Sequence, residues 1–204
     1  VLARDGLSTK EVLKSSVMPN STTKLIALAD GREMLLWLDD DPNRTDINRS
    51  MLYYAIRSNG VWSAEKAVND DDTYDSDFDA VYQDGKVYIT WVDLQKNLAQ
   101  DTSLEAMLAQ TDIVAIIYDA ATDSFSPRQL LSSGAAGSEG HPIIALSDTG
   151  TRASVIWQLN SSADHTTESG INRLLSAEYD GTNWTKGVSL YETEEKINSR
   201  RHSL

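Results

Sequence analysis

The chain of 204 residues contains no cysteine and no long apolar run. Without cysteine, disulfides, thiolate catalysis and cysteine-ligated zinc are excluded. No segment approaches the roughly 18 consecutive apolar residues of a membrane span, so we expect no membrane insertion. Neither a signal peptide nor a methionine opens the sequence. We therefore interpret Val1 as the start of a mature product or of a piece cut from a longer protein.

Positive charge is also scarce, with 18 Lys and Arg against 31 Asp and Glu and a formal net charge of −13. Phosphate recognition needs surfaces rich in Lys and Arg, so we expect no nucleic-acid partner. Such acidity fits a soluble protein that binds divalent cations or a cationic partner. The three histidines lack the spacing of metal ligands, and they are His141, His165 and His202.

An aromatic pattern repeats three times along the chain. Trp37, Trp91 and Trp157 recur at intervals of 54 and 66 residues, each within the second of several short apolar runs. A second aromatic position recurs near the fourth run of each copy, at Trp62, Phe125 and Trp184. Four short strands repeated with a period of roughly 40 residues or more are typical of β-propeller blades.

The predicted fold is therefore an all-β propeller segment, partial or completed by oligomerisation, with about three four-stranded blades plus a remnant strand pair. We expect one unit, 1–204, divided into the end of a preceding blade (1–14), three blades (24–69, 79–131 and 142–190) and a tail or the start of another blade (191–204). The recurring strand-two tryptophans either pack between blades or stack on sugars, and their identical placement favours packing.

Long, acidic connections fall in only two classes: those between strands two and three and those from strand four to the next blade. The largest insertion, 93–112, includes Thr102 to Glu105, which resembles a capping box, followed by good helix formers. The other turns are short. One face of the propeller is therefore elaborated, and in repeat folds that face is usually the binding face.

Two acidic stretches are candidate calcium sites. Alternate carboxylates occur in 75–79, which we expect to be a loop, and another cluster begins just after the first strand-two tryptophan. Hard cations prefer such oxygen ligands. Solvated acidic loops without metal are the alternative. The candidate ligands for Ca2+ are Asp39, Asp41, Asp75, Asp77 and Asp79.

Four residues at the starts of loops or third strands are candidates for binding a ligand. Arg49 and Arg173 close two identical Ile-Asn-Arg tripeptides and could converge on a carboxylate or sulfate, or else each could pair with a nearby acidic loop. Asp93 and Asn160 open the long insertions of the second and third blades. No nucleophile-elbow, phosphate-loop or dinucleotide motif is present, so no catalytic residue is predicted.

The stretches 51–55 (Met-Leu-Tyr-Tyr-Ala), 59–63 (Asn-Gly-Val-Trp-Ser) and 175–185 resemble the repeats of sialidase-like propellers in secreted bacterial proteins. The Asp box of that family, Ser-x-Asp-x-Gly-x-Thr-Trp, is only partly echoed, because Asp180 and Gly181 are adjacent and Ala177 replaces its Ser. The resemblance implies a secreted or cell-surface propeller. The catalytic residues of sialidases have no counterparts here, so it does not imply sialidase activity.

The leading interpretation is a non-enzymatic module that binds glycan or protein through its acidic loop face. One alternative is part of a propeller glycoside hydrolase or lyase whose catalytic residues lie partly outside this chain, and another is a structural scaffold. Three blades fall short of a ring and expose apolar faces, which we expect to dock the missing blades of a longer chain or a second copy in a homodimer.

Overall fold

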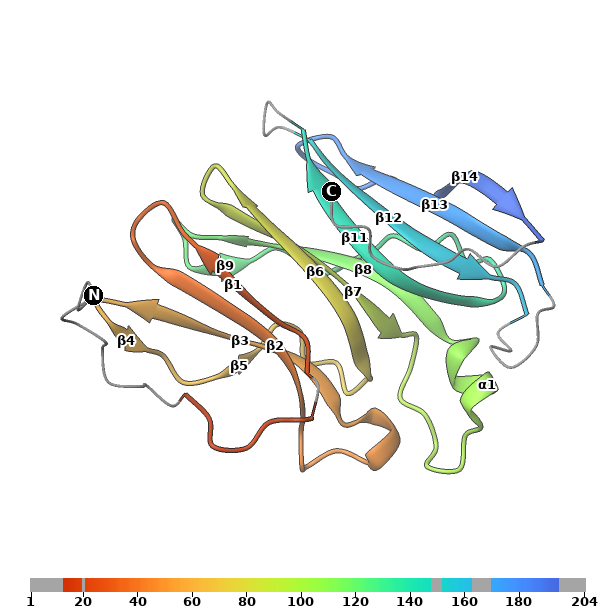
Figure 1. The fold of residues 1–204 in the computed structure, drawn as a ribbon, viewed down its shortest axis with the longest axis horizontal. Coiled ribbons are helices and arrows are strands. Elements are labelled where there is room, and N and C mark those ends of the chain that lie inside the picture. Colours follow the sequence, from red (N-terminus) through yellow and green to blue (C-terminus); the bar gives the residue numbers. More distant parts are fainter. Residues whose placement is uncertain (1–12, 20, 148–151, 163–169, 195–204) are drawn as a thin grey trace, which may run out of the picture.

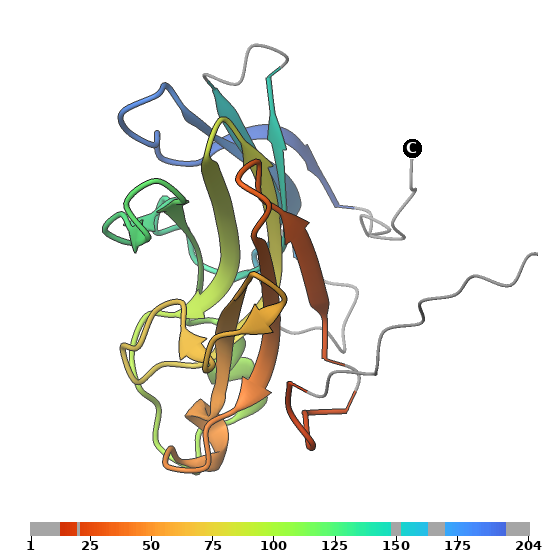
Figure 2. The same cartoon turned by 90° about the vertical axis from the view of Figure 1, so that its left-hand side faces the viewer.

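The structure is a computed structural model that describes residues 13–19, 21–147, 152–162 and 170–194. These residues form three antiparallel sheets that follow one another in chain order (Figure 1). Turned by 90°, the first sheet, which lies at the left of Figure 1, faces the viewer (Figure 2). The predicted all-β fold of three four-stranded units is confirmed.

Within each sheet, or blade, consecutive strands pair as neighbours. The fourth strand is broken into two short pieces in the first two blades and is continuous in the third. Blade one contains β1 (Thr23–Ala27), β2 (Glu33–Asp40), β3 (Ser50–Ser58), β4 (Val61–Trp62) and β5 (Lys66–Ala67). Blade two contains β6 (Asp75–Gln83), β7 (Lys86–Leu94), β8 (Thr111–Asp119), β9 (Ser124–Phe125) and β10 (Gln129–Leu130). Blade three contains β11 (Ser138–Leu146), β12 (Ala153–Asn160), β13 (Asn172–Tyr179) and β14 (Val188–Thr193).

The first strands of blades two and three begin earlier than the sequence predicts. β6 starts at Asp75 and β11 at Ser138, whereas the blades were expected to start at 79 and 142. The register of both strands shifts, between Ser76 and Phe78 in β6 and between Gly140 and Ile143 in β11. Such a bulge inserts extra residues and interrupts the alternation of apolar and polar side chains, which is the signal for a strand. The stretch 75–79 is therefore strand and not the predicted loop.

Other predicted limits differ less or lie outside the described residues. β14 continues to Thr193, past the expected end of blade three at 190. Most of the predicted remnant at 1–14 and of the tail at 191–204 lies outside the described residues.

Two apolar seams hold the blades together. The seam between blades one and two contains Trp91, and the seam between blades two and three contains Trp157, both nearly inaccessible to solvent. The packing role predicted for these tryptophans is confirmed. Trp37 of blade one lies on the outer side of the first blade, where it is buried and stacks on Tyr53 with ring centres 6.0 Å apart.

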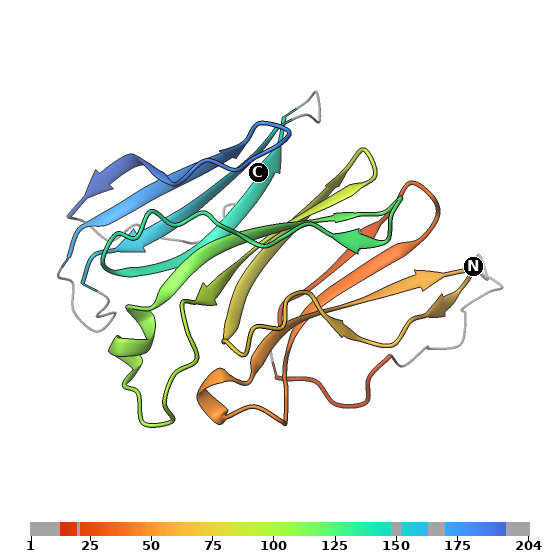
Figure 3. The same cartoon turned by 180° about the vertical axis from the view of Figure 1, so that it is seen from behind.

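The two ends of the stacked blades differ. At one end, the hairpin face, strands are joined by tight turns such as Asn59-Gly60 and Asp84-Gly85, whose φ angles are all positive, as type I′ turns require. At the other end, the loop face, lie the long connections, with the 3-10 helix η1 (Asp46–Asn48) and the helix α1 (Leu104–Leu108) (Figure 3).

The short helix predicted in the large insertion is present. Its N-cap is Ser103, whose Oγ accepts a hydrogen bond from the backbone nitrogen of Ala106 at 3.2 Å. The cap thus lies one residue after Thr102, the first residue of the predicted capping box. No helix of the described residues is long and apolar enough to cross a membrane.

The segment 13–19 contacts the outer side of blade one through Lys14, and its Met18 packs against the first seam. The Lys14 ammonium pairs with Asp39 at 2.7 Å and stands 5.4 Å above the ring of Tyr53. The backbone nitrogen of Met18 donates to the same carboxylate at 2.9 Å. These contacts fasten the segment near the loop face, because Asp39 is near the end of β2 that leads into the long connection.

Candidate functional site

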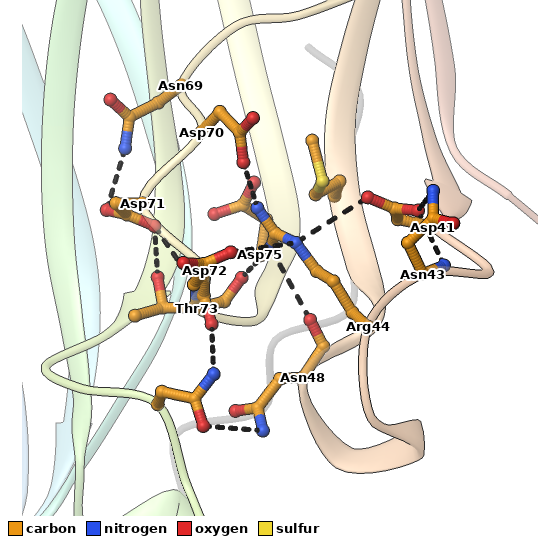
Figure 4. Close-up of polar contacts among 12 residues, drawn as sticks. Asp41, Asn43, Arg44, Asn48, Asn69, Asp70, Asp71, Asp72, Thr73 and Asp75 are labelled. Atoms are coloured by element: carbon orange, nitrogen blue, oxygen red, sulfur yellow. Dashed lines mark hydrogen bonds and ion pairs between the residues drawn. The ribbon is translucent and has the colours of Figure 1, made fainter.

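The acidic connections of the loop face are folded around one arginine (Figure 4). The side chain of Arg44 is only 6 % exposed, and it donates to the carbonyl oxygen of Thr73 at 2.6 Å and to Asp70 at 2.5 Å. Asp41 and Asp72 lie within 4.0 Å of its guanidinium. Arg44 thus provides one positive charge at the centre of these carboxylates and ties the two loops together.

An asparagine joins the loops of neighbouring blades. Asn48 is fully buried, accepts from the backbone nitrogen of Leu98 at 2.9 Å and donates to its carbonyl oxygen at 2.8 Å. Asn48 is the middle residue of the first Ile-Asn-Arg tripeptide. Its role is to tie the blade-one loop to the blade-two insertion.

The five predicted calcium ligands are distributed among separate partners. Asp39 binds the segment 13–19; although burial opposes ionisation, hydrogen bonds from Lys14, Asp40 and Met18 hold the pKa of Asp39 below its usual value. Asp41 accepts from the backbone and side chain of Asn43 at 2.9 and 3.0 Å.

The other three predicted ligands lie on β6. Asp75 faces the seam with blade one, whereas Asp77 and Asp79 contact the first strands of the flanking blades. In the part of the chain that the structure describes, no group of three acidic or histidine side chains is arranged to hold a metal ion.

Asp75 ties blade two to blade one. Its carboxyl accepts from the indole nitrogen of Trp91 at 2.8 Å and from the backbone nitrogen of Leu52, on blade one, at 2.9 Å. Burial and the nearby carboxyl of Asp93 raise the pKa of Asp75 well above its usual value. A carboxyl so enclosed is a structural tie, because no ligand can reach it.

Glu139 occupies the corresponding position in blade three. It pairs in register with Leu159, two residues after Trp157, just as Asp75 pairs with Asp93, two residues after Trp91. Ser132 donates to the Glu139 carboxyl and accepts from the backbone nitrogen of Ile113 on blade two. Burial raises the pKa of Glu139 to about 7, opposed by the hydrogen bond from Ser132 and reinforced by Asp112.

Asp93, a predicted ligand-binding residue, is fully buried. It forms an ion pair with Arg128 and accepts from the hydroxyl of Thr73 at 2.7 Å. Burial raises the pKa of Asp93 although Arg128 opposes that shift. Sequence reasoning did not identify Arg128, because nothing in its surroundings along the chain connects it with the end of β7.

The remaining predicted ligand-binding residues pair locally. Arg49 contacts Asp40 and Asp46, each at 3.2 Å, and Arg173 contacts Glu192 at 2.7 Å. Since the two arginines belong to blades separated by blade two, the structure does not bring them together. The Asn160 amide donates to Asn172 at 2.9 Å within the blade-three loop.

A different group of charged side chains gathers where the first strands of the three blades meet. We call Lys24, Asp77, Asp79 and His141 the axial cluster. β6 lies between β1 and β11, and first strands line the central channel of a propeller. Lys24 of β1 pairs with Asp79 of β6, which also accepts from the backbone nitrogen of Ile144 on β11 at 3.1 Å. Nδ1 of His141 lies 2.8 Å from Oδ2 of Asp77.

The bulges of β6 and β11 determine where the side chains of the axial cluster lie. Asp77 and His141 both have positive φ angles, 37° and 57°, and both lie within the register shifts. Non-glycine residues rarely adopt this conformation, and bulges with such residues are frequent beside functional sites, where they re-aim side chains. An acid-x-polar-apolar pattern, 75–78 and 139–142, marks both bulges in the sequence. That pattern is the signal that sequence reasoning missed.

The axial cluster combines groups suited to polar ligands and to proton transfer. A carboxylate in contact with an imidazole can exchange protons with a bound molecule if that molecule can reach both groups. His141 is mostly exposed and Asp77 partly so. The cluster is therefore accessible, unlike the buried carboxyls of the seams.

Comparison with known proteins gives no match to a family model and no match among curated proteins. Solved structures do match. The α-L-arabinanase of Penicillium chrysogenum complexed with arabinobiose has a TM-score of 0.52 at 11 % identity, covering 86 % of this chain and 50 % of that one. An α-L-arabinofuranosidase of Fusarium graminearum in complex with an iminosugar inhibitor has a TM-score of 0.52 at 13 % identity, with the same coverage. The levansucrase variant Y247A of B. megaterium has a TM-score of 0.52 at 10 % identity, covering 88 % and 55 %.

At these identities the likeness establishes the fold alone, and it supports a β-propeller. The chain spans about half the length of the structures that it matches. The likeness to propellers agrees with the broader part of the resemblance seen in the sequence, and it does not extend to sialidases in particular.

Proposed function

We propose that this chain is part of a propeller glycoside hydrolase and that its axial cluster contacts the glycan. The observation that carries the proposal is the convergence of Asp77, His141, Lys24 and Asp79 from three first strands, at strained bulges near the loop face. The fold shared with an arabinanase and an arabinofuranosidase supports a carbohydrate substrate. The alternative interpretation from the sequence thus has better support than the leading one, a binding module.

In this proposal Asp77 is the carboxyl that reacts, and His141 orients it. Glycoside hydrolysis uses two carboxyl groups on either side of the scissile bond. Asp79 is the less suitable second group, because it is engaged by Lys24 and by the backbone nitrogens of Ala80 and Ile144. The second carboxyl then comes from elsewhere in the complete propeller, in line with a chain that covers half of its structural neighbours. A secreted or cell-surface location remains a prediction.

The test is hydrolysis of arabinan and of 4-nitrophenyl α-L-arabinofuranoside by the complete propeller that contains this chain and by its variant Asp77→Asn. Asparagine tolerates positive φ and still accepts a hydrogen bond from His141, so the fold is retained while the carboxyl is lost. We expect a fall in turnover of at least roughly 100-fold, the usual worth of a general acid or base.

The matched control is Asp84→Asn in the β6–β7 turn, which also has positive φ, at 50°, but lies on the hairpin face. It should leave turnover unchanged. If the complete propeller that contains this chain hydrolyses neither substrate, the enzymatic proposal fails. Calorimetric binding of arabino-oligosaccharides without hydrolysis would instead restore the binding-module interpretation.

A further inference from the structure

The two internal seams share one packing rule near the hairpin face. A pair of residues on strands two and three of one blade meets a pair on strands two and three of the next. In both seams all of these residues are apolar or aromatic; for example, the rings of Tyr88 and Tyr179 are 5.8 Å apart across the second seam. The pairs facing the following blade are Met34–Ile56 and Tyr88–Ile117, and the pairs facing the preceding blade are Val87–Tyr118 and Ala153–Tyr179.

The outer faces of blades one and three break this rule at the same level. On blade three, the pair that would face a following blade is Ser154 with Glu178. On blade one, the pair that would face a preceding blade is Glu33 with Arg57, which form an ion pair at 3.0 Å. At this level both outer faces thus carry polar pairs where the internal seams carry apolar pairs. Glu178 on blade three and Arg57 on blade one are of opposite charge.

Apolar side chains lie next to these polar pairs on both outer faces. On blade three, Ile143 and Ile156 are register partners and are 58 % and 41 % exposed. On blade one, Leu25 is 59 % exposed and pairs in register with Leu35. The segment 13–19 is fastened to blade one through the contacts of Lys14 with Asp39 and Glu65. Blade three therefore presents an apolar row beside Glu178, and blade one presents an apolar row beside the Glu33–Arg57 ion pair.

We propose that a second copy of this chain docks on the outer face of blade three through its own blade one. The same contact is made in return, so two copies close a ring of six blades around a two-fold axis. Arg57 of one copy then lies against Glu178 of the other, and the Leu25 row packs on the Ile143 row. One copy covers about half of the length of the matched structures. The proposal does not rest on hydrolysis of any substrate.

The first test is the molar mass of the purified chain by light scattering at 10 to 100 micromolar, concentrations chosen on the order of those at which weak homodimers form. We expect twice the chain mass of 22.5 kDa. A monomer throughout this range would overturn the proposal, and so would open-ended oligomers, because head-to-tail contacts that fail to close give filaments.

The second test exchanges the charges. Glu178→Arg and Arg57→Glu each place like charges at both contacts of the ring, and we expect each to raise the dimer dissociation constant at least roughly tenfold. An equimolar mixture of the two variants restores opposite charges at both contacts and should dimerise again. Glu105→Arg, on the exposed α1, makes the same charge change elsewhere and should have no effect. Circular dichroism of each variant confirms folding. Unchanged dimerisation of the single variants, or a mixture as weakly associated as either variant alone, would refute the contact.

Discussion

Glu139 provides a pH-dependent test of the seam between blades two and three. Glu139 is 3 % exposed, its carboxyl interacts with Ser132 and Asp112, and burial raises its pKa from 4.5 to about 7. Between these values the folded chain keeps a proton that the unfolded chain has released. The free energy of unfolding therefore falls as the pH rises through this window, and the loss is complete above about pH 7.

The magnitude follows from the size of the shift. One pKa unit corresponds to roughly 1.4 kcal/mol, so the shift of Glu139 corresponds to about 3 kcal/mol between pH 4.5 and 7. The substitution Glu139→Gln keeps a neutral, hydrogen-bonding side chain of the same size and removes the titration. We expect the variant to gain about 3 kcal/mol relative to the wild type as the pH rises across this range.

The assay is urea unfolding followed by tryptophan fluorescence at several pH values between 4.5 and 8, at one protein concentration. Asp75, Asp93 and Asp112 also have raised pKa values, mainly through burial, and destabilise the fold in the same direction. The contributions of Asp75 and Asp93 cancel in the difference between wild type and variant, whereas Asp112, which interacts with Glu139, is part of the measured difference. A difference that stays constant with pH would show that Glu139 does not titrate in the folded chain as described.

Three further outcomes are expected. Trp157→Ala should lower the free energy of unfolding by about 3–5 kcal/mol, because it removes a buried indole ring from the second seam and leaves a cavity. An unchanged melting temperature would contradict the packing role of Trp157. Gly187→Ala should destabilise by about 1–3 kcal/mol, because the added Cβ overlaps the indole of Trp157, whereas Gly140→Ala, with open space around the Cβ, should cost less than half as much. Excess EDTA should leave the melting temperature unchanged, since the described acidic residues form no group arranged to hold a metal ion; a fall of several degrees would instead reveal a bound cation.

Much of the fold follows from local sequence patterns. The spacing of Trp37, Trp91 and Trp157 gives the number of blades, and turns such as Asn59-Gly60 give the hairpins, because positive φ at consecutive residues is a local property of those residue types. The helix after Ser103 likewise follows from its cap and its helix formers. These features depend on neighbours within a few residues, so a single sequence contains the information.

The site depends on contacts that only the packed blades create. Asp77 and His141 are 64 positions apart in the sequence, and they meet because two bulged first strands lie side by side around the axis. The acidic residues along 75–79 suggested calcium ligands, but the geometry of the strand places them in different surroundings. Asp75 points into a seam, whereas Asp77 and Asp79 point toward the axis. Alternation along a strand sends successive side chains to opposite faces, and a bulge shifts that alternation by one. Which carboxyl is buried as a tie and which remains accessible was therefore decided by the stacking of the blades.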